Sequence, residues 1–128
     1  MRLEVLSGLV TCGELNNAGA VKAIGDLRAY FLTGNIQVLS ETEATPQSTR
    51  WSVRYHCVWD TNGKKEGVKI SIETGRDLAG RFFVMPTVSS NNGIATKALA
   101  EISRRIQGYL TEAGANKVEY AGLVPVVG

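Results

Sequence analysis

The feature that most constrains the fold is the alternation of side chains in residues 50–60, RWSVRYHCVWD. Apolar side chains occupy every second position, namely Trp51, Val53, Tyr55 and Cys57. The intervening side chains are basic or polar, namely Arg50, Ser52, Arg54 and His56. Because successive side chains of a β-strand point to opposite faces of a sheet, the segment predicts a strand with one buried and one solvated face.

Three neighbouring segments predict further strands. Residues 35–42 begin with alternation, Ile36 and Val38 against Asn35 and Gln37. Residues 67–73 (GVKISIE) alternate again, and residues 81–88 (RFFVMPTV) form a strand that runs into Pro86. Short polar or glycine-containing segments separate all of them, including Asn62-Gly63, a typical tight-turn pair. Together they predict an antiparallel β-meander with one apolar and one polar face.

The C-terminal third opens with an amphipathic helix. Its apolar stripe recurs with helical spacing and consists of Ile94, Ala98, Leu99, Ile102, Ile106 and Leu110. Asn92 is one candidate for its N-cap, and Gly114 is a natural C-terminal stop. The tail KVEYAGLVPVVG is apolar, so we expect it to pack against the sheet or against another chain.

The N-terminal part is less regular. Residues 2–6 alternate, and Ser7-Gly8 suggests a turn into residues 9–12, which predicts a hairpin. Residues 17–31 leave two interpretations open. Val21, Ile24, Leu27 and Phe31 fit a helical stripe, whereas two glycines at positions 19 and 25 weaken a helix and favour an irregular strand.

These elements predict one α+β domain over residues 1–128, with an N-terminal hairpin, a meander sheet and a C-terminal helical region. The apolar face of the sheet is wide. One helix is about 10 Å across, whereas four strands at about 4.8 Å spacing span more. Either the N-terminal segment and tail complete the cover or a second subunit does, and we expect the second subunit.

Composition excludes several classes of protein. The net charge of +2 neither indicates nor excludes nucleic-acid binding. Cys12, Cys57 and His56 are too few for the usual four ligands of structural zinc, so we expect no metal and no cofactor. Two cysteines without a secretory signal are expected as buried thiols, a disulfide being the alternative. No segment reads as a signal peptide or membrane span, and we expect a cytosol-like compartment.

No pattern in the chain specifies an enzyme. Glycine-rich phosphate loops of the GxxxxGK[ST] and GxGxxG types are absent. His56 and Cys57 are neighbours on a strand and therefore point to opposite faces, so they do not form a nucleophile pair. We expect a protein without catalytic residues.

The polar face of the meander is the candidate binding surface. Arg50, Ser52, Arg54 and His56 lie on it, and Lys69, Ser71, Asn35 and Gln37 extend it on neighbouring strands. Such side chains donate to phosphates and base edges of RNA. The alternative is the ordinary solvated face of any antiparallel sheet. Glu41, Glu43 and Glu73 are expected to share this face, where they would repel phosphate.

The order of elements resembles the coat proteins of single-stranded RNA bacteriophages, the leviviruses. The segment LTGNIQVLSETEATPQSTRWSVRYHCVWD is similar to the central strand pair of that family. FVMPTVSSNNGIATKALAEISRRIQGYL is similar to its last strand and first helix, and AGLVPVVG to its apolar terminus. The resemblance covers nearly the whole chain and is one of pattern and order. It departs at residues 18–31, which look more helical than the second strand of the family.

The resemblance implies a homodimer that assembles into an icosahedral shell in the host cytoplasm and remains in the virion. Helices would lie across the partner's sheet over a dimer core of Trp51, Val53, Tyr55, Cys57, Ile102 and Ile106. The inner face would bind a genomic RNA hairpin, package the genome and repress translation. By position, the resemblance assigns RNA binding to Gln37, Leu39, Ser52, Arg54 and His56. The polar-face pattern adds Arg50, Lys69 and Ser71 to the predicted RNA-binding residues.

The resemblance also assigns a role to residues 74–80. This segment would make contacts between subunits around the symmetry axes, with Gly75 and Gly80 allowing different loop shapes. Its residues are Thr74, Gly75, Arg76, Asp77, Leu78, Ala79 and Gly80.

Other functions fit the same pattern. A small cytosolic nucleic-acid-binding module would share the polar face without forming a shell. A structural protein of a tailed phage would have no nucleic-acid role, and an enzyme with an acid–base pair at a dimer cleft ranks last.

Overall fold

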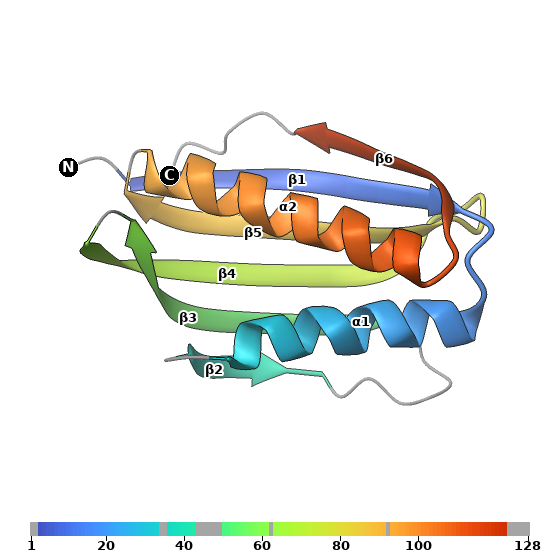
Figure 1. Cartoon of the computed structure of the whole chain (residues 1–128), viewed down its shortest axis with the longest axis horizontal. Coiled ribbons are helices and arrows are strands. Elements are labelled where there is room, and N and C mark those ends of the chain that lie inside the picture. The colour runs from blue at the N-terminus through green and yellow to red at the C-terminus, as the bar shows by residue number, and fades with distance from the viewer. Residues whose placement is uncertain (1–2, 34–35, 43–49, 62, 92, 123–128) are drawn as a thin grey trace.

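The computed structural model describes residues 3–33, 36–42, 50–61, 63–91 and 93–122 (Figure 1). These residues form an α+β fold with six strands and two helices. In chain order the elements are β1 (Leu3–Gly13), α1 (Asn17–Leu32), β2 (Ile36–Glu41), β3 (Trp51–Thr61), β4 (Lys64–Arg76), β5 (Phe82–Asn91), α2 (Ile94–Glu112) and β6 (Asn116–Gly122).

The strands form one antiparallel sheet in the order β2-β3-β4-β5-β1-β6. Strands β2 to β5 are the predicted meander. The other connections are crossovers, because β1 lies between β5 and β6 and runs antiparallel to both. β5 and β6 are therefore parallel to each other and are joined by α2, an arrangement of the split β-α-β type.

Both helices cover the same face of this sheet (Figure 1). α2 lies over β5 and β1, and α1 lies beside it over the β3 side. Their inward positions hold small or aliphatic side chains, such as Ala20 and Ala23 on α1 and Ala98 and Ile102 on α2. Small side chains let the helices approach the sheet closely, and larger ones fill the remaining space.

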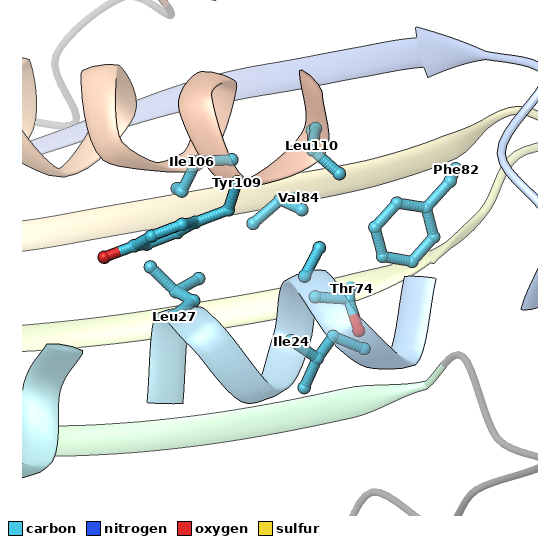
Figure 2. Close-up of a pocket in the computed structure, with 9 residues that line it drawn as sticks. Ile24, Leu27, Thr74, Phe82, Val84, Ile106, Tyr109 and Leu110 are labelled. Carbon is cyan, nitrogen blue, oxygen red and sulfur yellow. The ribbon is translucent and has the colours of Figure 1, made fainter. Parts of the chain in front are cut away.

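The two helices meet over the middle of the sheet. Figure 2 shows Leu27 and Ile24 of α1 facing Ile106 and Tyr109 of α2. The space left between them is only about 10 Å³, roughly the room that one water needs. This seam is therefore a packed core contact and leaves no room for a ligand.

The chain covers its apolar face with its own helices. Val53, Tyr55 and Ile72 are fully buried within a single chain. The argument that a second subunit must cover this face is therefore wrong, because residues 17–32 supply a second helix. The ambiguity at residues 17–31 is resolved as helix, with the Gly19 N–H donating to Asn16 Oδ1 at 2.7 Å as its N-cap.

The predicted N-terminal hairpin is wrong, because residues 3–13 form one continuous strand. Gly8 marks a close approach instead of a turn. A Cβ built on Gly8 would lie 2.7 Å from Tyr120 Cε2 on β6. The neighbouring Ser7 pairs with Thr87 on β5, and the two hydroxyls are hydrogen-bonded at 2.8 Å. Residues 7 and 8 therefore belong to the sheet and do not form a turn.

One predicted strand end also differs. β5 passes through Pro86 and continues beyond the predicted residues 81–88 to Asn91, because Val84 and Val88 on either side of Pro86 are buried and paired with both neighbouring strands. The tail forms the edge strand β6, and residues 123–128 lie outside the described residues. The helix ends as predicted near Gly114, which has φ of 98°. Its N-cap is Gly93, and the candidate Asn92 lies outside the described residues.

Candidate nucleic-acid interface

The face of the sheet opposite the helices carries most of the predicted RNA-binding side chains. The strand register places them in two paired rows across the sheet. One row runs through Gln37, His56, Lys69 and Ser89. The next runs through Ser40, Arg54, Ser71 and Thr87. Since paired strands lie about 4.8 Å apart, Arg54, His56 and Lys69 form one compact cationic and polar group.

This surface, which we call the open face, lies opposite α1 and α2 and is accessible. Arg54, His56 and Lys69 are exposed, and none of them forms a salt bridge within the part of the chain that the structure describes. Their donors therefore remain available to phosphate oxygens and base edges. The prediction that β3 has one apolar and one polar face is thus confirmed.

Leu39 reaches the open face through an irregularity in β2. Val38 pairs with Tyr55 and Ser40 with Arg54, so Leu39 is an extra residue between two consecutive partners. It borders a shallow hollow of about 190 Å³ together with Arg54, Lys69 and Ser71. Such a bulge re-aims the side chains around it. Val38, expected to be buried, is 42% exposed as a consequence of lying in this edge strand.

Glu41 does not lie on the open face, contrary to expectation. The same bulge turns its side chain to the helix face, where Arg28 Nε donates to Oε1 at 2.6 Å. The Trp51 indole N–H donates to the same oxygen at 3.1 Å. The hydrogen bond from Arg28 lowers the pKa of Glu41 below its usual value. Of the three predicted acids, Glu73 does lie on the open face, opposite Ser52, and Glu43 is outside the described residues.

The predicted dimer core lies inside the single chain. Trp51, Tyr55 and Cys57 are buried under the helices, as are Ile102 and Ile106 of α2. Burial raises the pKa of Tyr55 to about 12 and that of Cys57 to about 11. Cys12 and Cys57 are free, buried thiols. These residues form the hydrophobic core that supports the open face from behind.

The predicted inter-subunit segment is only partly a loop. Thr74, Gly75 and Arg76 belong to β4, and the Thr74 hydroxyl accepts the Trp51 N–H at 2.8 Å. These three residues are therefore sheet residues rather than flexible contact residues, because strand pairing with β3 and β5 holds them. The turn itself spans residues 77–80.

This turn is rigid and presents one apolar side chain. Asp77 Oδ1 accepts the N–H groups of Ala79 and Arg81, each at 2.9 Å, and Arg81 Nε donates to Oδ2 at 3.0 Å. Arg76 adds a bond to the Gly80 carbonyl at 3.1 Å. Leu78 at the tip is fully exposed.

Several side chains of the open face were missed by sequence reasoning. Phe83, Met85, Thr87 and Ser89 of β5 are half-buried there. Their signal was present in the alternation of residues 82–91, where the odd positions face one side. The predicted strand of residues 81–88 already contained Phe83, Met85 and Thr87, but these positions were not assigned to the polar face.

The described residues contain no group of three or more His, Cys, Asp and Glu side chains placed to hold a metal ion. No helix within the described ranges is both long and apolar enough to cross a membrane. Comparison with known proteins found no family model and no curated sequence that matches this chain.

Proposed function

We propose that this chain binds single-stranded RNA through the open face of its sheet and acts as a coat protein of the levivirus type. The observation that carries the RNA-binding proposal is the group of Arg54, His56 and Lys69 on paired strands, exposed on the face opposite α1 and α2. Cationic side chains on a sheet neutralise phosphates, and adjacent hydroxyls and amides read unpaired bases.

The surroundings of this group support the same conclusion. Ser71 and Ser40 lie beside Arg54, and Gln37 lies beside His56, so neutral donors and acceptors surround these side chains. Of the acids expected on this face, Glu41 is turned away and paired with Arg28, whereas Glu73 lies on the open face opposite Ser52. Arg50 is exposed just before β3 and extends the positive charge along the sheet.

Two features support self-assembly. The exposed Leu78 stands at the tip of a turn that hydrogen bonds to Asp77 hold in one shape. The resemblance to coat proteins implies contacts between subunits at this turn, and its hydrogen-bonded shape would present Leu78 to a neighbouring chain. The edge strands β2 and β6 also have an outer edge that pairs with no other described strand, and edges of this kind join sheets of neighbouring chains.

On this proposal the partners are further copies of the chain and a single-stranded RNA, in particular a hairpin whose loop bases are unpaired. The chain would assemble in the host cytoplasm, enclose its genome in an icosahedral virion and repress translation through the bound hairpin. It would act without a catalytic site or cofactor.

A second candidate is a small nucleic-acid-binding module that never forms a shell. The observation that favours it is the complete cover of the apolar face by α1 and α2 of the same chain. Such a chain has a sealed core as a single subunit and binds RNA without needing a partner.

Electron microscopy of the purified full chain, combined with nuclease treatment, tests the proposal. We expect uniform closed particles that contain RNA protected from nuclease. RNA binding by a small oligomer that forms no particles at any concentration would support the module instead. Particles without any RNA affinity would overturn the RNA-binding part and point to a purely structural phage protein.

A further inference from the structure

The open face has a second hollow, at the end where β3 begins and β4 ends. It measures about 390 Å³, within the roughly 300–1,000 Å³ typical of small-molecule sites. Its walls include Arg50, Ser52, Glu73, Gly75 and Phe83. Glu73, Gly75 and Phe83 are not among the predicted RNA-binding residues.

The floor of this hollow is aromatic. A Cβ built on Gly75 would lie 3.3 Å from Cε1 and Cζ of Phe83, so the ring lies directly over the backbone of β4. Phe83 pairs with Gly75 across the strands. Because position 75 has no side chain, the half-buried ring is held flat against the sheet and still borders the hollow.

A polar pair stands beside the ring. Glu73 on β4 is exposed and pairs directly with Ser52 on β3. A carboxylate accepts hydrogen bonds and does not donate them. Arg50, also exposed, supplies a positive charge at the side of the same hollow.

The hollow also continues the cationic group of the open face. Glu73 is two residues from Ser71 on the same strand and face, a separation of about 7 Å. A strand of RNA bound by Arg54 and Lys69, as proposed above, would therefore pass beside this hollow. The half-buried ring of Phe83 and the carboxylate of Glu73 match the flat face and the amino group of one base.

We propose that this hollow takes one unpaired base that carries an exocyclic amino group, which is cytosine, adenine or guanine, of the RNA bound on the open face. The base stacks on Phe83, and its exocyclic amino group donates to Glu73. Uracil is rejected, because it presents a carbonyl oxygen where cytosine presents its amino group and that oxygen faces the carboxylate. This inference rests on the proposed RNA binding and adds a base preference to it.

The test compares fluorescently labelled oligocytidine and oligouridine of equal length, titrated with the full chain at one salt concentration. We expect the wild-type chain to bind oligocytidine about tenfold more tightly, the lower range for one good contact to a base edge. Glu73→Gln should reduce this ratio to near one, because an amide both donates and accepts.

A second variant tests the stacking. Phe83→Leu keeps an apolar side chain over Gly75 but removes the aromatic face. We expect it to weaken binding of both oligonucleotides by at least about fivefold, the lower range for loss of one base–aromatic stack. Circular dichroism of each variant verifies that the sheet is intact.

The outcomes separate this inference from the proposed function. If Arg54→Ala weakens binding but wild type and Glu73→Gln show the same cytidine-to-uridine ratio, the base site is overturned and RNA binding stands. If Phe83→Leu leaves both affinities unchanged, the stacking role is overturned. If the wild-type chain binds neither oligonucleotide, both proposals are overturned.

Discussion

Arg28 on α1 and Glu41 on β2 form a two-pronged ion pair, with Nε to Oε1 at 2.6 Å and the second guanidinium nitrogen to Oε2 at 3.1 Å. This ion pair connects α1 to the edge strand β2. The indole N–H of Trp51 joins it from β3. One carboxylate thus ties together three elements that are separate in the chain.

Removal of Glu41 should destabilise the chain more than removal of Arg28. We expect Arg28→Ala to lower the free energy of unfolding by about 0.5–1 kcal/mol, the range of partly exposed ion pairs. Glu41→Ala also leaves the Trp51 N–H without its acceptor, which adds about 1 kcal/mol or more. Urea denaturation of the two variants measures the difference, and equal losses would contradict the role of Trp51.

The same ion pair should make stability depend on pH. The folded-state pKa of Glu41 lies below its usual value of 4.5. Its contribution is therefore fully present above about pH 4.5 and is lost as pH falls through the lower folded-state pKa. We expect the stability difference between wild type and Glu41→Gln to shrink between pH 6 and roughly pH 3 in denaturant titrations. In an Arg28→Ala background the ion pair is absent, so the same Glu41→Gln comparison should change much less with pH.

Two glycines of α1 should respond oppositely to alanine. A Cβ on Gly19 would lie 2.8 Å from the Ala113 carbonyl oxygen, a backbone atom that does not move aside easily. We therefore expect Gly19→Ala to destabilise the fold by about 1–3 kcal/mol. Gly25 has open space around its Cβ position, so Gly25→Ala should stabilise the helix by about 0.5–1 kcal/mol. Thermal denaturation of both variants checks the signs, and a stabilising Gly19→Ala would refute the close helix packing.

Loss of the cations on the open face should weaken RNA binding in a salt-dependent manner. The slope of log affinity against log salt changes by about 0.7 for each phosphate contact to a single strand. We expect Arg54→Ala with Lys69→Ala to reduce the slope by about 1.4 in filter-binding titrations from low to high salt. Lys97→Ala with Arg104→Ala removes the same charge from exposed positions of α2 on the helix side. An equal effect of this control pair would mean that net charge alone attracts RNA.

Leu78 should matter for assembly and not for folding. Its side chain is fully exposed at the turn, so Leu78→Asp should leave thermal stability nearly unchanged while it prevents closed particles from forming. Leu3→Asp is a matched control, because Leu3 is also an exposed leucine but lies at the other end of the sheet. Light scattering and electron microscopy report the result, and intact shells of Leu78→Asp would exclude this contact.

Features that depend on neighbouring residues could be predicted from the sequence, whereas features that depend on residues far apart in the chain could not. The two faces of β3 and the stripe of α2 follow from alternation and helical spacing within one segment, so Arg54, His56 and Ser52 were placed on the open face from sequence. The side of Glu41 could not be predicted in this way. It depends on a bulge in β2 and on Arg28, which lies on a different element.

Periodicity in the sequence by itself determined the meander, the amphipathic C-terminal helix and the polar character of one sheet face, because each reflects side-chain spacing within a short segment. Only the tertiary structure decided that residues 17–32 are a helix that seals the sheet, that Gly8 lies within a strand beside Tyr120, and that Phe83 covers Gly75. A glycine marks equally a turn, a helix break or a close approach. Which of these it is depends on the atoms that distant parts of the chain bring next to it.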